Sequence, residues 1–165
     1  MTLVEDVVRV GIADMKIAKG NQSIRTSGLG SCVGVVLYDE VVPLAGMVHV
    51  MLPSSNLAKD SSFNLAKFAD TGVRELADTL SQQGGRLSRM KAKIAGGAQM
   101  FQFTTGSELM RIGPRNVEAV TNVLENLGIP LISKDVGGSN GRTIEFHLHS
   151  FMLNVRTVNM GIKDI

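Results

Sequence analysis

Residues 33–52 read VGVVLYDEVVPLAGMVHVML, and this stretch decides the fold. The runs 33–38 and 45–52 are rich in valine and other apolar side chains, which favour extended backbone in a buried sheet. Between them, residues 39–43 carry acidic side chains and a proline, a composition that is typical of a turn. The stretch therefore predicts two antiparallel strands joined by a short connection.

The register of this hairpin determines which side chains meet. If Tyr38 opposes Ala45, then Gly34 opposes His49, because opposed positions in an antiparallel pair keep a constant sum. Cys32 then lies diagonally beside His49 on the same face of the sheet. Any odd sum keeps Cys32 and His49 on one face, whereas an even sum separates them. Gly34 has no side chain and leaves room beside the imidazole for a substrate or for the thiol to swing across.

The elements around the hairpin follow from hydrophobic periodicity. Residues 64–83 place apolar side chains at three- and four-residue spacing and predict a helix, which the following glycine pair ends. A second helix is expected over residues 113–127, which open with Gly-Pro. Further strands are expected at 7–17 (one or two strands), 91–95, 130–136, 143–149 and 152–158. This order predicts an α/β fold with mixed, largely antiparallel β-sheets packed with two main helices in a layered single domain, residues 1–165.

Composition and charge exclude several classes of protein. The 165 residues are 44% hydrophobic and 19% charged, the balance of a globular chain. A single cysteine excludes an internal disulfide and favours a reducing, cytoplasmic setting. A net charge of +2 with few aromatic residues gives neither a basic stripe nor stacking side chains, so we expect no nucleic acid. The least polar stretch, residues 41–52, is too short for a membrane span, and we expect no signal peptide and no membrane insertion.

The single cysteine lies in an unusual neighbourhood. Residues 26–34 read TSGLGSCVG, so Cys32 lies among glycines and hydroxyl side chains directly before a strand. A thiol is a nucleophile only as the thiolate, and it needs a base or a positive neighbour to reach that state. His49 is the nearest such group in the sequence. The hydroxyl of Thr26 or of Ser27 can fold back to His49 and fix its tautomer, as the third member of a triad does.

Two glycines of this segment could help to form an oxyanion hole, which acyl transfer also requires. Gly28 and Gly30 allow a close approach of backbone N–H groups, which an oxyanion hole needs. The opposing interpretation is structural, because a lone cysteine is more often a small buried hydrophobe and a histidine between two valines is more often a core residue. The segment also matches a Gly-x-Cys-x-Gly nucleophile elbow, but a helix follows an elbow and a strand follows this one, so we reject the elbow.

The other two histidines raise the question of a metal. His147 and His149 would share one face of a strand with Glu145, a spacing that suits metal ligation. The alternative is a solvated sheet face, since the residues between them are apolar and face the other way. We favour that alternative and expect no metal and no cofactor, because a third and a fourth ligand would have to come from elsewhere.

Several blocks together resemble the bacterial chemoreceptor glutamine deamidase family, CheD. The resemblance runs from about residue 7 to residue 146 and is less diagnostic beyond that point. The blocks that carry it are TSGLGSCVGVVLYDE (26–40), LAGMVHVMLP (44–53), KAKIAGGAQMF (91–101), GPRN (113–116) and DVGGSNGRTIEF (135–146).

The resemblance implies a cysteine hydrolase that converts selected receptor glutamines to glutamates and releases ammonia. In the family the cysteine of the GSC block is the nucleophile, the histidine of the HVMLP block is the base, and a threonine six positions before the cysteine is the third member. These positions hold Cys32, His49 and Thr26 here. Some members are also said to act on receptor methyl esters.

The resemblance also implies partners. They are the cytoplasmic domains of methyl-accepting chemoreceptors and a CheC-type phosphatase that holds the deamidase away from them. Phe101 and Phe103 are our candidates for the phosphatase contact, with packing in the core as the alternative. A different class of function stays open at this point, namely a mainly non-catalytic chemotaxis adaptor that docks to receptors or to the phosphatase. A pure adaptor would not need the complete set of Thr26, Cys32 and His49.

Overall fold

Two five-stranded sheets and two α-helices make up the molecule. The structure, a computed structural model, describes residues 6–60, 62–100 and 111–165. We call β1-β3-β8-β9-β10 the outer sheet and β2-β5-β4-β6-β7 the central sheet. The outer sheet contains β1 (Val7–Val10), β3 (Ser23–Leu29), β8 (Arg142–His147), β9 (Met152–Thr157) and β10 (Gly161–Asp164). The central sheet contains β2 (Met15–Lys19), β5 (Leu44–Val50), β4 (Val33–Asp39), β6 (Lys91–Gly96) and β7 (Leu131–Val136).

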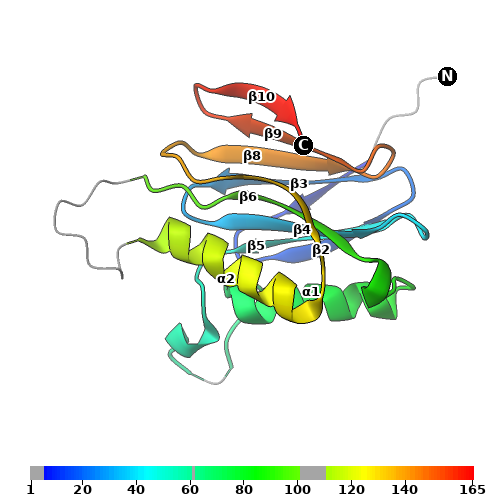
Figure 1. Cartoon of the computed structure of the whole chain (residues 1–165), viewed down its shortest axis with the longest axis horizontal. Coiled ribbons are helices and arrows are strands. Elements are labelled where there is room, and N and C mark those ends of the chain that lie inside the picture. Colours follow the sequence, from blue (N-terminus) through cyan, green and yellow to red (C-terminus); the bar gives the residue numbers. More distant parts are fainter. Residues whose placement is uncertain (1–5, 61, 101–110) are drawn as a thin grey trace.

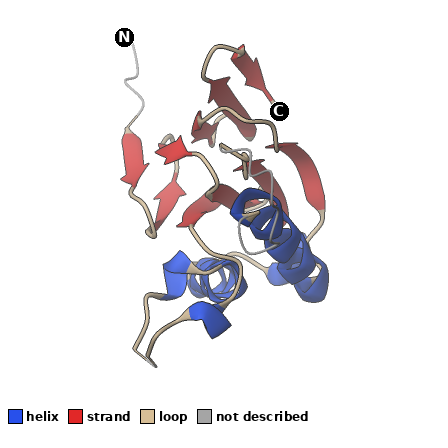
Figure 2. Cartoon of the chain, turned by 90° about the vertical axis from the view of Figure 1, so that its left-hand side faces the viewer, coloured by secondary structure: helices blue, strands red, loops and turns tan. Residues whose placement is uncertain are grey.

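The two sheets and the helices form three layers. The helices α1 (Ala69–Gln82) and α2 (Ile112–Leu127) pack on one face of the central sheet, and the outer sheet packs on its other face. Figure 1 shows α1 and α2 together on one side of the strands, with β8, β9 and β10 on the opposite side. The same separation is visible from the side in Figure 2. One apolar cluster therefore lies under the helices and a second lies between the sheets.

Strand directions agree with the fold class predicted from the sequence. β1 pairs with β3 in parallel and β6 pairs with β7 in parallel, while the other paired strands run antiparallel. The sheets are thus mixed and largely antiparallel, as predicted. The central strands β4 and β5 are buried at every position, because helices cover one face and the outer sheet covers the other.

The predicted hairpin register is confirmed. Tyr38 opposes Ala45 and Gly34 opposes His49, which is the odd sum that keeps Cys32 and His49 on one face. A Cβ built on Gly34 would lie 2.6 Å from Cδ1 of Ile144 in the outer sheet. The face of β4 and β5 that carries Gly34 and His49 therefore points between the two sheets. The expectation of open room at Gly34 was wrong, because Ile144 of the outer sheet fills that space.

The predicted helices are confirmed, with one shifted start. Residues 64–83 were predicted to be helical throughout, but α1 begins at Ala69, after a 3₁₀ turn over Leu65–Lys67. Phe68 between them is extended and pairs with Leu52 in an isolated bridge, which interrupts the helical hydrogen bonds. The second helix ends as predicted at Gly128, which adopts the left-handed conformation with φ of 72°.

Two strands were missed by the sequence analysis. No strand is expected between residues 17 and 33, but the structure contains β3 (Ser23–Leu29) there, with an irregularity in its pairing to β8 between Thr26 and Leu29. Glycine and serine hid this strand, since neither favours extended backbone by itself. β10 was also missed because its four residues are all exposed and show no alternation of polarity.

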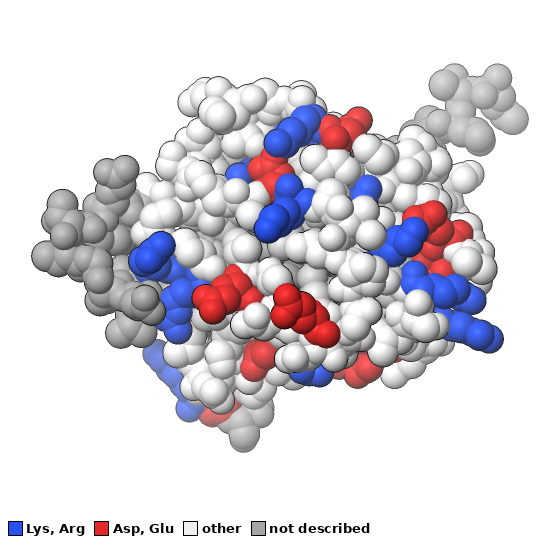
Figure 3. Space-filling model, in the orientation of Figure 1, with Lys and Arg blue, Asp and Glu red and all other residues white. Residues whose placement is uncertain are grey.

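Charged side chains of both signs mix on the surface. Figure 3 shows lysine and arginine interspersed with aspartate and glutamate on the face that it presents, with uncharged surface between them. Nucleic-acid binding by backbone neutralisation needs a continuous basic stripe. This face does not present one.

Candidate active site

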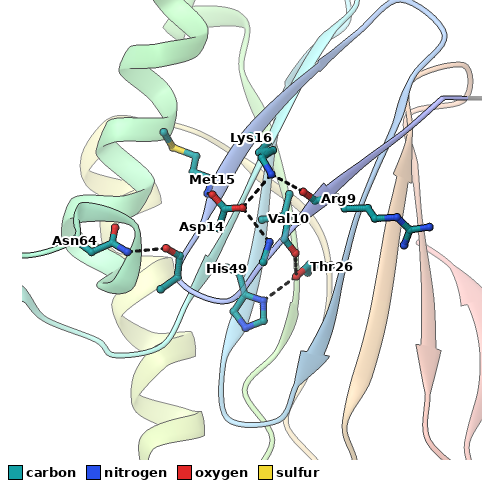
Figure 4. Close-up of polar contacts among 10 residues, drawn as sticks. Arg9, Val10, Asp14, Met15, Lys16, Thr26, His49 and Asn64 are labelled. Carbon is teal, nitrogen blue, oxygen red and sulfur yellow. Dashed lines mark hydrogen bonds and ion pairs between the residues drawn. The ribbon is translucent and has the colours of Figure 1, made fainter.

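A threonine from the outer sheet and a histidine from the central sheet meet between the two layers. Oγ1 of Thr26 lies 2.8 Å from Nδ1 of His49 and 2.9 Å from the carbonyl oxygen of Val10 (Figure 4). A hydroxyl has a single proton, and the Val10 carbonyl can only accept, so Thr26 donates to Val10 and accepts from Nδ1–H. We therefore assign the Nδ1–H tautomer to His49, which leaves the lone pair on Nε2.

The backbone of His49 is also held in place. Its carbonyl oxygen accepts from the N–H of Ala13 and its N–H donates to the carbonyl oxygen of Asp14, both at 3.0 Å. The loop between β1 and β2 thus bonds to the main chain near the end of β5, and the Asn64 side chain donates to the Ala13 carbonyl at 2.8 Å (Figure 4). The imidazole is fully buried and its orientation is fixed at both the side chain and the main chain.

The second ring nitrogen of His49 is available. Nε2 is buried and has no hydrogen-bond partner among the described residues. Burial lowers the pKa of His49 to about 4, from an ordinary value of 6.5. The imidazole is consequently neutral at physiological pH and can accept a proton at Nε2.

Cys32 lies just before β4 and is partly exposed. It packs at the margin of the apolar cluster between the sheets, on the face that carries His49. Burial raises the pKa of the Cys32 thiol above its ordinary value, although its own backbone N–H acts in the opposite direction. Because Nε2 of His49 has no partner among the described residues, the resting site holds a neutral thiol and a neutral imidazole without a hydrogen bond between them.

The structure thus places the three expected residues as follows. Thr26 and His49 are joined by a hydrogen bond, and Cys32 lies just before β4, against the apolar cluster between the sheets and two residues before Gly34, which opposes His49. Ser27, the other hydroxyl that we considered, is exposed. The sequence analysis missed the Val10 carbonyl, and it could not have found it, because β1 and β3 are brought together only by sheet pairing.

The buried imidazole makes stability depend on pH. Unfolded His49 takes up a proton near its ordinary pKa of 6.5, whereas folded His49 does so only near its pKa of about 4. The unfolded state therefore gains protons first as the pH falls, and the natural protein should lose up to about 3 kcal/mol of unfolding free energy from this residue between pH 7 and pH 4. Urea denaturation of the natural protein and of His49→Gln at several pH values checks this. The difference between the two curves should change by that amount, and parallel curves would contradict it.

Comparison with known proteins identifies the family. Residues 51–157 match the family model described as CheD chemotactic sensory transduction. The chain is 54% identical over 160 residues to the chemoreceptor glutamine deamidase CheD of Halalkalibacterium halodurans, which covers 97% of this chain and 99% of that protein. The chain belongs to the CheD family.

The likeness to CheD proteins extends across several bacteria and almost the whole chain. The chemoreceptor glutamine deamidase CheD of Bacillus subtilis is 55% identical over 159 residues, with 96% of each chain covered. A probable chemoreceptor glutamine deamidase CheD of Caldanaerobacter subterraneus is 48% identical over 159 residues, with 96% of this chain and 98% of that protein covered. These alignments include the segment that holds the three candidate residues, whereas the CheD family model begins after His49.

A solved structure shares the architecture of this CheD chain. The Bacillus licheniformis hypothetical protein YfiH matches with a TM-score of 0.50 and 15% identity, covering 76% of this chain and 51% of that chain. At that identity the likeness concerns the fold alone. In the described ranges of this CheD chain, no helix combines the length and the hydrophobicity needed to cross a membrane.

The described residues do not form the metal site that His147, His149 and Glu145 suggested. Nε2 of His147 lies 3.6 Å from a carboxylate oxygen of Glu145, and the rings of His147 and His149 lie 5.3 Å apart. Within residues 6–60, 62–100 and 111–165, no three side chains of the ligating types come together as a metal would require. Phe101 and Phe103, the candidates for the phosphatase contact, lie outside the described residues.

Proposed function

We propose that this chain hydrolyses the side-chain amide of glutamines in chemoreceptors, using Cys32 as the nucleophile, His49 as the base and Thr26 as the residue that orients the base. Membership of the CheD family and the names of its relatives supply the substrate class. The observation that carries the chemical assignment is the buried Nε2 of His49, which has no hydrogen-bond partner among the described residues. Thr26 holds the ring through Nδ1, on the face that carries the only cysteine of the sequence.

The first half of the reaction forms a thioester. The thiol proton of Cys32 moves to Nε2 of His49 while the sulfur bonds to the amide carbon, and the π electron pair of the carbonyl moves to its oxygen. The tetrahedral intermediate collapses as the C–N bond breaks. Its nitrogen takes the proton from the imidazolium and leaves as ammonia. Thr26 keeps the imidazole in one tautomer throughout, because its lone pair accepts Nδ1–H.

The second half releases glutamate. His49 removes a proton from a water molecule, and the resulting hydroxide adds to the thioester carbon. The C–S bond then breaks and the sulfur regains the proton from the imidazolium. Since the thiol and the imidazole are neutral and not hydrogen-bonded to each other at rest, the proton transfer begins only when a substrate brings Cys32 within reach of Nε2 of His49.

Partners and location follow from this activity and are part of the proposal. The receptor segments that carry the target glutamines belong to cytoplasmic domains, so we place the protein in the cytoplasm. Regulation by a CheC-type phosphatase follows from the family resemblance. Its contact surface stays a prediction, because the segment that we expected it to use is not described.

The proposal is tested with purified protein and cytoplasmic fragments of chemoreceptors from the same organism. We expect mass spectrometry to find specific glutamines converted to glutamates, with one ammonia released for each conversion. Heat-denatured protein is the control for spontaneous deamidation. If folded protein binds the fragments and converts no glutamine, the hydrolase proposal fails and the docking alternative replaces it.

A further inference from the structure

Asn116 is a buried polar side chain to which the reaction scheme above gives no role. It lies in the first part of α2 and is fully buried. Its Nδ2 donates to the carbonyl oxygens of Ser31 and Met51, at 2.9 Å each. Both acceptors are carbonyls, so the amide group must turn its NH₂ toward them, and this fixes the orientation of the side chain. Its Oδ1 has no partner among the described residues.

The two acceptors belong to the segments that carry the nucleophile and the base. Ser31 immediately precedes Cys32, and Met51 follows His49 by two residues. One short side chain therefore joins the cysteine segment to the end of β5. The short reach is possible because α2 comes very close to the chain after β6, where a Cβ on Gly113 would lie 2.3 Å from the carbonyl oxygen of Ala98.

Three consecutive carbonyls of the cysteine segment are held by donors. The Gly30 carbonyl accepts from the N–H of Ala98 and the Cys32 carbonyl accepts from the N–H of Gly97, both at 2.8 Å. The Ser31 carbonyl between them accepts from Asn116. Each peptide unit from Gly30 to Val33 thus has a fixed plane, and the middle one is fixed by a side chain.

The fixed Ser31 carbonyl sets the direction of the next N–H. A trans peptide is planar, so the N–H of Cys32 points away from the side on which the Ser31 carbonyl lies. That N–H lies close enough to the sulfur of Cys32 to lower the pKa of the thiol, against the larger effect of burial. Among the described residues it has no other acceptor. An N–H beside the attacking sulfur is well placed for an oxygen that becomes negative as the sulfur adds to a carbonyl.

We propose that Asn116 is a positioning residue, which holds the Ser31 carbonyl so that the Cys32 N–H points at the oxyanion formed when Cys32 attacks a carbonyl. This inference rests on the proposed function for its natural substrate. A side chain of α2 thereby orients the Cys32 N–H, the donor to the oxyanion. The same role explains why a polar amide is buried where α2, the cysteine segment and the chain after β5 meet.

The test compares two reactions of the same sulfur. Acyl transfer develops an oxyanion, whereas alkylation by iodoacetamide is a displacement at carbon and develops none. In Asn116→Leu, which keeps similar bulk and has no donor, we expect kcat for deamidation of receptor fragments to fall about 10²-fold to 10³-fold with KM changed by less than about threefold. Acylation of Cys32 by p-nitrophenyl acetate should fall about tenfold or more. The alkylation rate constant should stay within about threefold of the natural value.

Controls separate positioning from loss of structure. Thr121→Ala changes the same helix, where its hydroxyl donates to the Val117 carbonyl, and should leave all three rates unchanged. Asn116→Ala serves as a second variant if the leucine does not fold. Equal losses of acyl transfer and alkylation, or no loss of acyl transfer, would overturn the inference. If the natural protein is acylated by the ester and does not deamidate receptor fragments, the proposed function fails while the role of Asn116 is still decided by the ester and iodoacetamide rates.

Discussion

Cys32→Ala should abolish deamidation, with a loss of at least about 10⁴-fold in kcat/KM for receptor fragments, because the thioester can no longer form. The protein should stay folded, since Cys32 is partly exposed at the margin of the apolar cluster and leaves only a small void. The measurement is glutamine-to-glutamate conversion by mass spectrometry, with circular dichroism of the same samples. Equal conversion by the natural protein and the variant would remove Cys32 as the nucleophile.

The same variant distinguishes catalysis from docking. In cells, an adaptor would act equally well with alanine at position 32, whereas a deamidase would lose its effect on receptor modification and keep its receptor binding. Alkylation of the natural protein supplies a second route to the same result. Cys32 is the only cysteine of the chain, so iodoacetamide at completion should inactivate the natural protein through that residue.

Thr26→Val is expected to have the next largest effect. Valine matches threonine in shape and has no hydroxyl, so Nδ1–H of His49 and the Val10 carbonyl both lose their partner. With the tautomer of His49 no longer fixed, we expect kcat to fall about 10²-fold to 10³-fold. The unfolding free energy should also fall by about 1 to 3 kcal/mol, because Thr26 is almost completely buried.

Thr26→Ser is the matched control for that variant. Serine keeps the hydroxyl that can bridge Val10 and His49, so kcat should recover to within about tenfold of the natural value. Steady-state kinetics on receptor fragments and urea denaturation measure the two effects separately. A valine variant as active as the serine variant would show that the hydrogen bond to His49 plays no part in the reaction.

The order of apolar and polar residues along the chain predicted the β4–β5 hairpin and the helices well. The apolar runs on either side of residues 39–43 defined β4 and β5, and the parity of opposed positions placed Cys32 and His49 on one face. This worked because both strands are buried on two sides, so their composition is dominated by burial. The helices were equally clear from their spacing, apart from the extended Phe68 that delays the start of α1.

Tertiary contacts account for what the sequence did not reveal. β3 carries glycine and hydroxyl residues and is a strand only because β1 and β8 pair with it on either side. The sequence indicated Thr26 as a partner of His49. It did not indicate the Val10 carbonyl, which determines the tautomer, because Val10 lies on β1 and no local pattern predicts the parallel pairing of β1 with β3. Asn116 was noticed only as part of the entry to a helix. Its bonds to Ser31 and Met51 join residues 85 and 65 positions away in the chain.

The hydrogen bond between Thr26 and His49 crosses from one sheet to the other. The imidazole therefore keeps its orientation only while the two sheets keep their positions relative to each other. A slip between the layers would lengthen that bond and leave the strand pairing within each sheet unchanged. The rate of turnover therefore depends on how the two sheets are aligned. On warming, it should decline before circular dichroism detects any unfolding.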